Sequence, residues 1–194
     1  MTLFGPLYVR VLKWSRHPHA ERYLAALSFA ESSFFPVPPD VMLAPMCLAN
    51  RARAWRLATL TTLASLLGGA AGYGIGYFLF DTLQPWLRQA GYWDAYLTGR
   101  AWFDTWGVWA VLVAGFSPIP YKVFTIAAGV ATLNLPLFML ASLVGRGARF
   151  FLVAGLVVAG GERMAAWLPK YVERIGWATV GLAVLIGLYA LRAN

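Results

Sequence analysis

A short stretch, ESSFFPVPPD at 31–40, places three prolines between two carboxylates, and apolar runs over 23–35 and 40–49 reach it from either side. A helix needs about 20 apolar residues to cross a bilayer, so neither run crosses alone. The prolines remove backbone donors and clash with the preceding turn, which keeps the two runs from forming one helix. The stretch therefore predicts a re-entrant hairpin over 23–50, with its broken tip supported by protein or water.

The remaining apolar runs decide the fold class. The 194 residues are 60% hydrophobic and 12% charged, about half the charge of a soluble domain. The sequence predicts an all-α integral membrane protein with spanning helices at 57–80 and 136–160. Residues 1–22 alternate apolar and basic side chains, which is typical of an interfacial helix, and 161–194 predict a cytoplasmic loop and a C-terminal spanning helix.

A second tip, FSPIPYKV at 116–123, matches the first at a shift of 82 residues. The shift places Pro36 on Pro118, Pro38 on Pro120 and Asp40 on Lys122. The match predicts two repeats, each a hairpin followed by a spanning helix. Their expected boundaries are 23–80 for the first repeat, 81–104 for an interfacial connection and 105–160 for the second repeat, with its hairpin over 105–135.

The basic residues favour one topology. If the ends of the first hairpin lie in the cytoplasm, ten of the 16 Lys and Arg residues fall on the cytoplasmic side, three fall outside and three lie within the membrane. This bias follows the positive-inside rule, so we expect a cytoplasmic N-terminus. The two hairpins then enter from opposite faces, as an inverted repeat. Broken helices at matching places of two repeats indicate the central site of a transporter.

Five ionisable residues lie within apolar runs, and each costs at least about 2.5–3.5 kcal/mol at the bilayer centre, so each should face a cavity or a partner. Glu31, beside Ser33, either caps the broken tip or exchanges a proton. Asp40 begins a half-helix, where a carboxylate suits the helix dipole, so a structural and a functional role are equally open. These residues, taken as a lipid and proton site, are Glu31, Asp40, Lys122, Arg146 and Arg149.

Lys122 begins the matching half-helix, where a cation opposes the dipole, so an anion is expected beside it. Arg146 and Arg149 share a helix face and either pair with Glu31 and Asp40 or bind a phosphate. We expect Asp40 and Lys122 to face one polar cavity, within direct or one-water reach. That pairing would leave the two arginines free on the cavity wall.

Three glycines and a single cysteine complete the pattern. Gly68, Gly72 and Gly76 recur at every fourth residue, which allows neighbouring helices to approach closely. Cys47 excludes a disulfide within the chain and a cysteine metal cluster, and we expect no metal and no cofactor. The basic residues are scattered between apolar runs, so we expect no nucleic-acid partner despite the net charge of +8.

With these residues in place, the chain resembles the DedA superfamily of SNARE-associated or VTT-domain proteins, most of all its YqaA-like branch. ESSFFPVPPD, the glycine-rich helix, FSPIPYK with the following AAG, and GRGARF carry the resemblance over about 20–165. It implies paired re-entrant hairpins that move phospholipids or a polyprenyl-phosphate carrier, often coupled to protons. Of the two arginines that the family has near the second tip, the later falls on Lys122. The earlier falls near Ala114 or Gly115, so Arg146 and Arg149 are candidates to replace it.

Three functions compete. The leading one is a lipid transporter or scramblase of a bacterial inner membrane, with phospholipid or polyprenyl phosphate and protons as partners and with Glu31 resetting the site. An intramembrane hydrolase would use Ser32 or Ser33, but no histidine lies in a membrane run to act as base, so we expect no catalytic residue. A structural or assembly protein is the third, and a homo-oligomer stays open.

Overall fold

The structure, a computed structural model, describes residues 17–35, 37–91, 93–117 and 121–161, and every regular element in these ranges is helical. Two helices, Arg51–Thr82 and Leu135–Gly161, are long and apolar enough to cross a membrane. The predicted 1–16 part of the interfacial segment, the segment after 161, and Pro36, Pro118 and Pro120 lie outside the described residues. In chain order, the labelled helices are α2 (Ala20–Ser33), α3 (Asp40–Ala49), the short 3₁₀ helix η1 (Arg51–Arg53), α4 (Ala54–Gln89), α5 (Trp93–Phe116) and α6 (Tyr121–Val130).

The order of helices is the same in the two halves of the chain: a helix, a proline-containing tip, a helix of 10 residues, and a long helix. With 14 and 10 residues, α2 and α3 are about 21 and 15 Å long, too short for a hydrocarbon core of about 30 Å. Pro38 and Pro39 directly precede α3, where a missing backbone N–H does no harm to the helix.

The segment 81–104 is more regular than an interfacial loop would be. Helix α4 continues to Gln89 and α5 begins at Trp93, because charged and aromatic side chains do not by themselves end a helix. The break falls at Gly91, whose φ of 75° is a left-handed conformation that favours glycine after a helix end. Helix α5 therefore has 24 residues and starts well before the expected boundary at 105.

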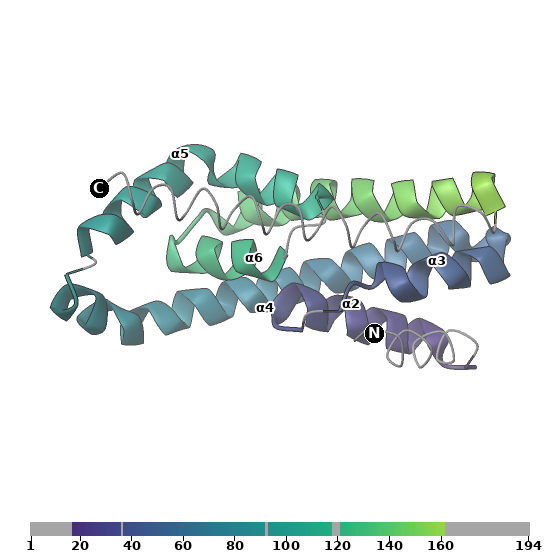
Figure 1. Cartoon of the computed structure of the whole chain (residues 1–194), viewed down its shortest axis with the longest axis horizontal. Coiled ribbons are helices and arrows are strands. Elements are labelled where there is room, and N and C mark those ends of the chain that lie inside the picture. Colours follow the sequence, from purple (N-terminus) through teal and green to yellow (C-terminus); the bar gives the residue numbers. More distant parts are fainter. Residues whose placement is uncertain (1–16, 36, 92, 118–120, 162–194) are drawn as a thin grey trace, which may run out of the picture.

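Helix α4 runs along the whole molecule, and α2 and α6 lie one after the other beside it (Figure 1). Ser28 bonds to Thr61 and Ser32 to Ser65, so α2 runs parallel to α4. Farther along α4, α6 takes the same direction. The C-terminal end of α2 thus meets the N-terminal end of α6, where the Thr125 hydroxyl donates to the Ser32 carbonyl at 3.2 Å.

Glycines make this arrangement possible. A Cβ at Gly68 would overlap the backbone of Phe29 in α2, and one at Gly76 would overlap the backbone of Ile126 in α6. Gly72 lies between them, against Thr125 of α6 and the Ser32 carbonyl of α2. The glycine face of α4 is therefore the surface on which both short helices rest.

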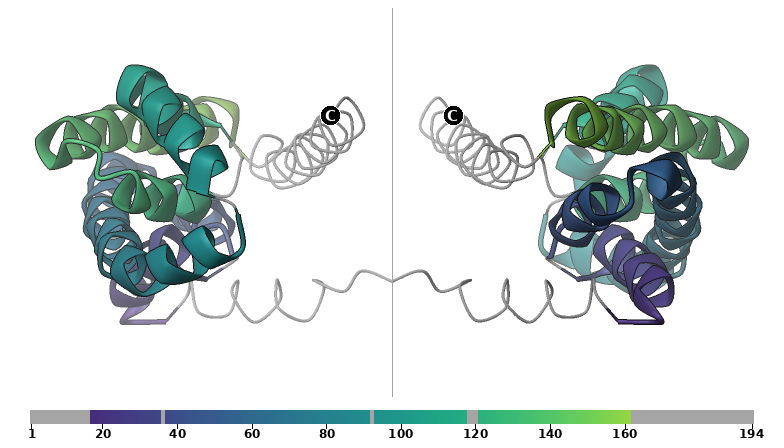
Figure 2. Two further views of the ribbon diagram at one scale, coloured as in Figure 1. Left: turned by 90° about the vertical axis from the view of Figure 1, so that its left-hand side faces the viewer. Right: turned by 90° about the vertical axis from the view of Figure 1, so that its right-hand side faces the viewer.

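Two apolar clusters pack at opposite ends of the bundle. One joins α2 and α3 to the start of α4 and the end of the helix Leu135–Gly161. The other joins α5 and α6 to the start of that same helix. Seen end-on, the helix Leu135–Gly161 lies on the opposite side of the bundle from α2 (Figure 2). The buried face of Leu135–Gly161 reads apolar, polar, apolar along its length, and its polar part lies beside the two tips.

Candidate functional site

A layer of buried polar side chains separates the two apolar clusters and gathers at the tips of both hairpins. Asp40 and both arginines of the helix Leu135–Gly161 belong to it, and the partly buried Glu31 lies at its edge. The sequence predicts these four and names Ser32 and Ser33, but not the other hydroxyl groups around them. The buried polar residues are Ser28, Ser32, Ser33, Asp40, Thr61, Thr62, Ser65, Thr125, Ser142, Arg146 and Arg149.

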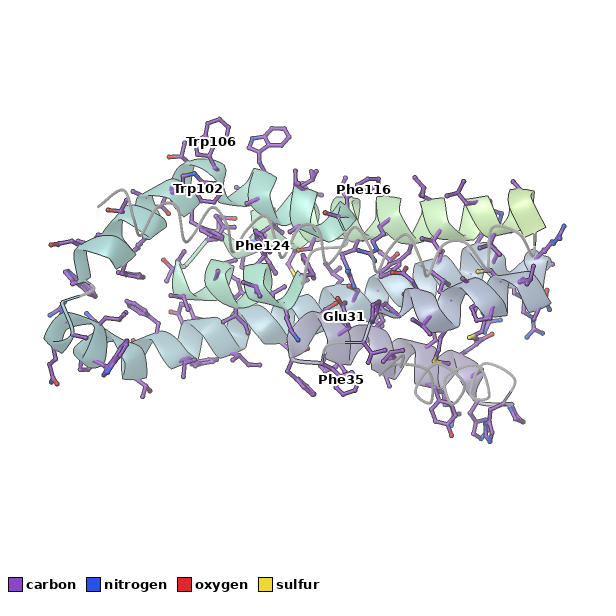
Figure 3. The ribbon with its side chains drawn as sticks, viewed as in Figure 1. Glu31, Phe35, Trp102, Trp106, Phe116 and Phe124 are labelled. Atoms are coloured by element: carbon purple, nitrogen blue, oxygen red, sulfur yellow. The ribbon has the colours of Figure 1, made fainter. Side chains whose placement is uncertain are left out.

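Glu31, in the last turn of α2, forms an ion pair with Arg146 (Figure 3 marks Glu31). The Arg146 Nε–H donates to the Ser65 hydroxyl at 2.6 Å, and its Nη2 also lies 3.3 Å from the Ser32 hydroxyl. The guanidinium carbon lies 4.9 Å from the centre of the Tyr121 ring and 4.7 Å from that of Phe150. Fully buried, the guanidinium is held by charge, hydroxyl groups and aromatic faces together.

Asp40, the first residue of α3, forms the second ion pair, with Arg149 at 2.5 Å. The other end of the Arg149 fork donates to the Ser117 carbonyl at 2.6 Å, just after α5. Arg149 therefore bonds to both tips at once. The second carboxylate oxygen of Asp40 is buried and has no hydrogen-bond partner among the residues that the structure describes.

Arg146 and Arg149 both show the pairing that one of the two hypotheses expects. Both guanidinium groups are engaged by carboxylates of the first tip, so in this structure neither is free for a phosphate. The spacing of three residues places them on one face, as expected, and that face points at the first hairpin.

Lys122 has no carboxylate within ion-pair distance among the described residues, so the expected direct pair with Asp40 is not formed. Its Nζ instead donates to the Phe34 carbonyl at 3.4 Å. The C-terminal end of α2 leaves backbone carbonyls without intrahelical partners, and a cation suits that end of the dipole. The carbonyls at the end of α2 therefore explain why a cation lies at the start of α6, where the dipole of α6 alone disfavours it.

The two tips thus form two junctions, each between the end of one hairpin's first helix and the start of the other hairpin's second helix. At one, Lys122 of α6 donates to the Phe34 carbonyl after α2. At the other, Arg149 donates to the Ser117 carbonyl after α5, beside Asp40 of α3. The second junction contains a carboxylate for its cation, and the first does not.

The remaining predicted residues have structural surroundings. The Ser33 hydroxyl donates to the carbonyls of Phe29 and Gly68, which ties α2 to α4. Pro38 lies half-buried in the first tip. No group of three or more His, Cys, Asp or Glu side chains that could hold a metal occurs within the ranges described.

Sequence reasoning missed the hydroxyl groups that line the ion pairs, Ser65 above all. A signal for them was available, since Ser28 and Ser32 in one apolar run and Thr61 and Ser65 in another are spaced by four residues, which places each pair on one helix face. Tyr121, whose hydroxyl donates to Ser142, has no such periodic signal.

The surface around Lys122 is apolar. Phe34 and Val123 are exposed beside Lys122, which is itself half-buried. Phe35 and Phe116 are also exposed, on opposite edges of the bundle (Figure 3). Trp102 and Trp106 point outward from the far part of α5. A cation that opens onto an apolar surface beside a broken tip can bind an anionic head group while the attached chains stay in lipid.

Comparison with known proteins gives a family. The family model of the VTT domain matches residues 21–159. An uncharacterized protein of Haemophilus influenzae is 46% identical over 185 residues, which cover 95% of this chain and 96% of that protein. A Histophilus somni protein, described as an uncharacterized protein HI0703 homolog, is 45% identical over 188 residues, which cover 97% and 98%. No solved structure matches the chain significantly.

Proposed function

We propose that this chain, which belongs to the VTT-domain family, the DedA family of membrane proteins, is a membrane lipid transporter or scramblase. Its substrate is a phospholipid or a polyprenyl phosphate, whose phosphate crosses the bilayer past the two tips while the acyl or prenyl chains remain in lipid. The protein acts in a bacterial inner membrane with its N-terminus in the cytoplasm.

Lys122 is the observation that carries this proposal. Glu31 and Asp40 are neutralised by Arg146 and Arg149, so Lys122 leaves one positive charge over at the tips. A cation held among apolar side chains is stabilised by an anion, and a lipid phosphate supplies one. Its position at the edge of the site, half-buried beside exposed Phe34, suits a head group that arrives from the lipid side.

The hairpins are proposed to be re-entrant and to enter from opposite faces. The short lengths of α2, α3 and α6 support the first part, and the excess of basic residues on the expected cytoplasmic side supports the second. Under this topology both tips lie near the midplane, where unwound backbone can be satisfied by side chains such as Arg149.

Glu31 is the proposed proton site. When Glu31 is ionised it holds Arg146, and when it takes up a proton the ion pair loses its Coulomb attraction and the guanidinium becomes available to a phosphate. Proton uptake by Glu31 thus frees Arg146 to bind the phosphate. We assign no hydrolase role, because the single hydrogen of the Ser33 hydroxyl is already engaged by the backbone carbonyls of Phe29 and Gly68.

A scaffold or assembly role is the second candidate, and the two complete ion pairs favour it. Buried pairs that bridge several helices also suit a protein whose purpose is a fixed shape. The two roles differ at Lys122, because in a scaffold its bond to the Phe34 carbonyl only joins α6 to α2, whereas in a transporter its charge binds the phosphate.

Transport by the purified full-length protein in proteoliposomes tests the proposal. The probes are phospholipids labelled on the head group and a polyprenyl phosphate, each followed from one leaflet to the other. We expect parental protein to move at least one of them, and Lys122→Met to lose most of that rate without loss of folding. Arg100→Met is the matched control, since Arg100 is an exposed cation that bonds to Thr132 away from the tips. Parental protein that moves neither lipid class would refute the proposal.

A further inference from the structure

Four side chains at the first tip form a closed ring of hydrogen bonds. The ring joins Glu31 and Ser32 of α2, Ser65 of α4, and Arg146 of the helix Leu135–Gly161. The two hydroxyl oxygens lie 2.7 Å apart, and the Ser32 hydroxyl donates to the Glu31 carboxylate at 3.2 Å. Both serines and the arginine are buried.

The direction of the bonds in this ring follows from its chemistry. An arginine has only donors, so the Arg146 Nε–H donates to the Ser65 hydroxyl oxygen at 2.6 Å. Because the hydrogen of Ser32 goes to Glu31, the hydrogen of Ser65 goes to Ser32. Every hydrogen bond in the ring therefore runs toward the Glu31 carboxylate, and both hydroxyl hydrogens are used.

Ser65 makes a contact with Arg146 that lies outside the ion pair. It is the member on α4, the helix against which both hairpins pack, and it holds the Nε side of Arg146 while Glu31 holds the Nη2 side. Contacts at two neighbouring nitrogens fix the orientation of a guanidinium more firmly than a contact at one of them.

We propose that Ser65 is a positioning residue that passes a change in the proton state of Glu31 to Arg146. This inference rests on the proposed proton exchange at Glu31. With Glu31 protonated, its new O–H can donate to Ser32, and Ser32 can donate to Ser65. The Ser65 hydrogen can then turn toward the Thr61 carbonyl four residues earlier, which it would share with the Ser28 hydroxyl. Only hydroxyl hydrogens rotate, the added proton stays on Glu31, and the guanidinium is released from the carboxylate.

The groups that face Glu31 come from three neighbouring helices. Arg146 approaches from the helix Leu135–Gly161, Ser65 from α4, and Tyr121 from α6, with its ring beside the Arg146 guanidinium. Lys122 of α6 contacts the same end of α2 through the Phe34 carbonyl. A change in the proton state of Glu31 therefore acts on the two cations Arg146 and Lys122 and on the Tyr121 phenol.

The first test compares Ser65→Ala with Thr62→Ala across a range of pH in the proteoliposome assay. Thr62 is the matched control, because it is buried on the same helix but its hydroxyl donates only to the Ala58 carbonyl of that helix. We expect Ser65→Ala to slow transport about tenfold, the effect of a strong interhelical hydrogen bond, and to displace its pH dependence. Ser65→Thr, which keeps the hydroxyl, restores both, and Thr62→Ala changes neither. Parental pH dependence in Ser65→Ala, or the same displacement in Thr62→Ala, overturns the inference.

A second test needs no transport, so it separates failure of this inference from failure of the proposed function. Ser65→Ala and Arg146→Lys are combined, and thermal unfolding is followed in detergent. Lysine has no Nε–H for Ser65, so Ser65→Ala should lower the unfolding temperature in the parental protein and hardly at all in the Arg146→Lys background. Shifts that simply add would show that Ser65 does not act through Arg146.

Discussion

Glu31 and Arg146 are buried to different degrees. The Glu31 side chain is 13% exposed and that of Arg146 is 2% exposed. The acid is therefore the more accessible member of the pair. This difference in burial suits an acid that exchanges protons and an arginine that is released when the acid is protonated.

Replacing Glu31 by glutamine should abolish transport and its pH dependence without blocking membrane insertion, because the amide keeps the shape but cannot bind or release a proton. Glu31→Asp should keep part of the activity. Glu21→Gln is the control, since Glu21 pairs with Arg56 in an exposed position. Transport by Glu31→Gln at the parental rate and with the parental pH profile would remove the proton role.

The Asp40–Arg149 pair leads to a prediction about stability. Asp40→Ala should lower the free energy of unfolding by about 3–5 kcal/mol, because Arg149 then remains buried without a carboxylate. The double variant Asp40→Ala with Arg149→Met should recover much of that loss, since no uncompensated charge remains. Denaturant titration of the purified protein in detergent measures both values. A double variant that loses as much as the two single variants together would contradict the pairing.

At the scale of helices, the glycine face of α4 sets how closely α2 and α6 approach. Gly76→Ala should lower the free energy of unfolding by about 1–3 kcal/mol, because its Cβ would overlap the Ile126 backbone and push α6 away. Gly74→Ala, two residues earlier and with no atom within 4 Å, should be neutral or stabilising by up to about 1 kcal/mol. Equal losses in the two variants would show that backbone propensity, and not close packing, is being measured.

The break between α2 and α3 follows from the sequence because it depends on local rules. Prolines and run length predict where α2 and α3 separate, and the four-residue spacing of Gly68, Gly72 and Gly76 predicts a close-packing face. The extent of α4 and α5 does not follow from hydropathy or from prolines, since Pro85 lies inside α4. The chain instead leaves α4 beside Gly91, which has a positive φ.

The partners of the charged residues could not be read from the chain in the same way. Spacing places Arg146 and Arg149 on one face, but which carboxylate each meets depends on the packing of helices more than 100 residues apart in sequence. The pairing of Asp40 with Lys122 rested on their equivalent places in the repeats. In the structure equivalent places lie at different junctions, so Lys122 meets the end of α2 and Asp40 meets Arg149.

At the scale of the whole molecule, the positive-inside topology can be tested by labelling from each side of the membrane. In a Cys47→Ser background, Arg53→Cys before α4 and Arg100→Cys in α5 place single thiols at exposed positions. An impermeant maleimide added to spheroplasts should label position 100, and position 53 should react only after the membrane is opened. Labelling of both positions from one side would contradict the inverted arrangement.

The long-range pairing at the tips also sets the order of events during synthesis. Asp40 and Arg149 are 109 residues apart, and Glu31 and Arg146 are 115 apart. At about 5–20 residues per second, a ribosome makes each carboxylate about 5–25 s before its arginine. An ionised carboxylate without a partner is unstable in hydrocarbon. Under the proposed re-entrant topology, the nascent chain therefore holds the first hairpin near water or at the insertion machinery until the helix Leu135–Gly161 emerges.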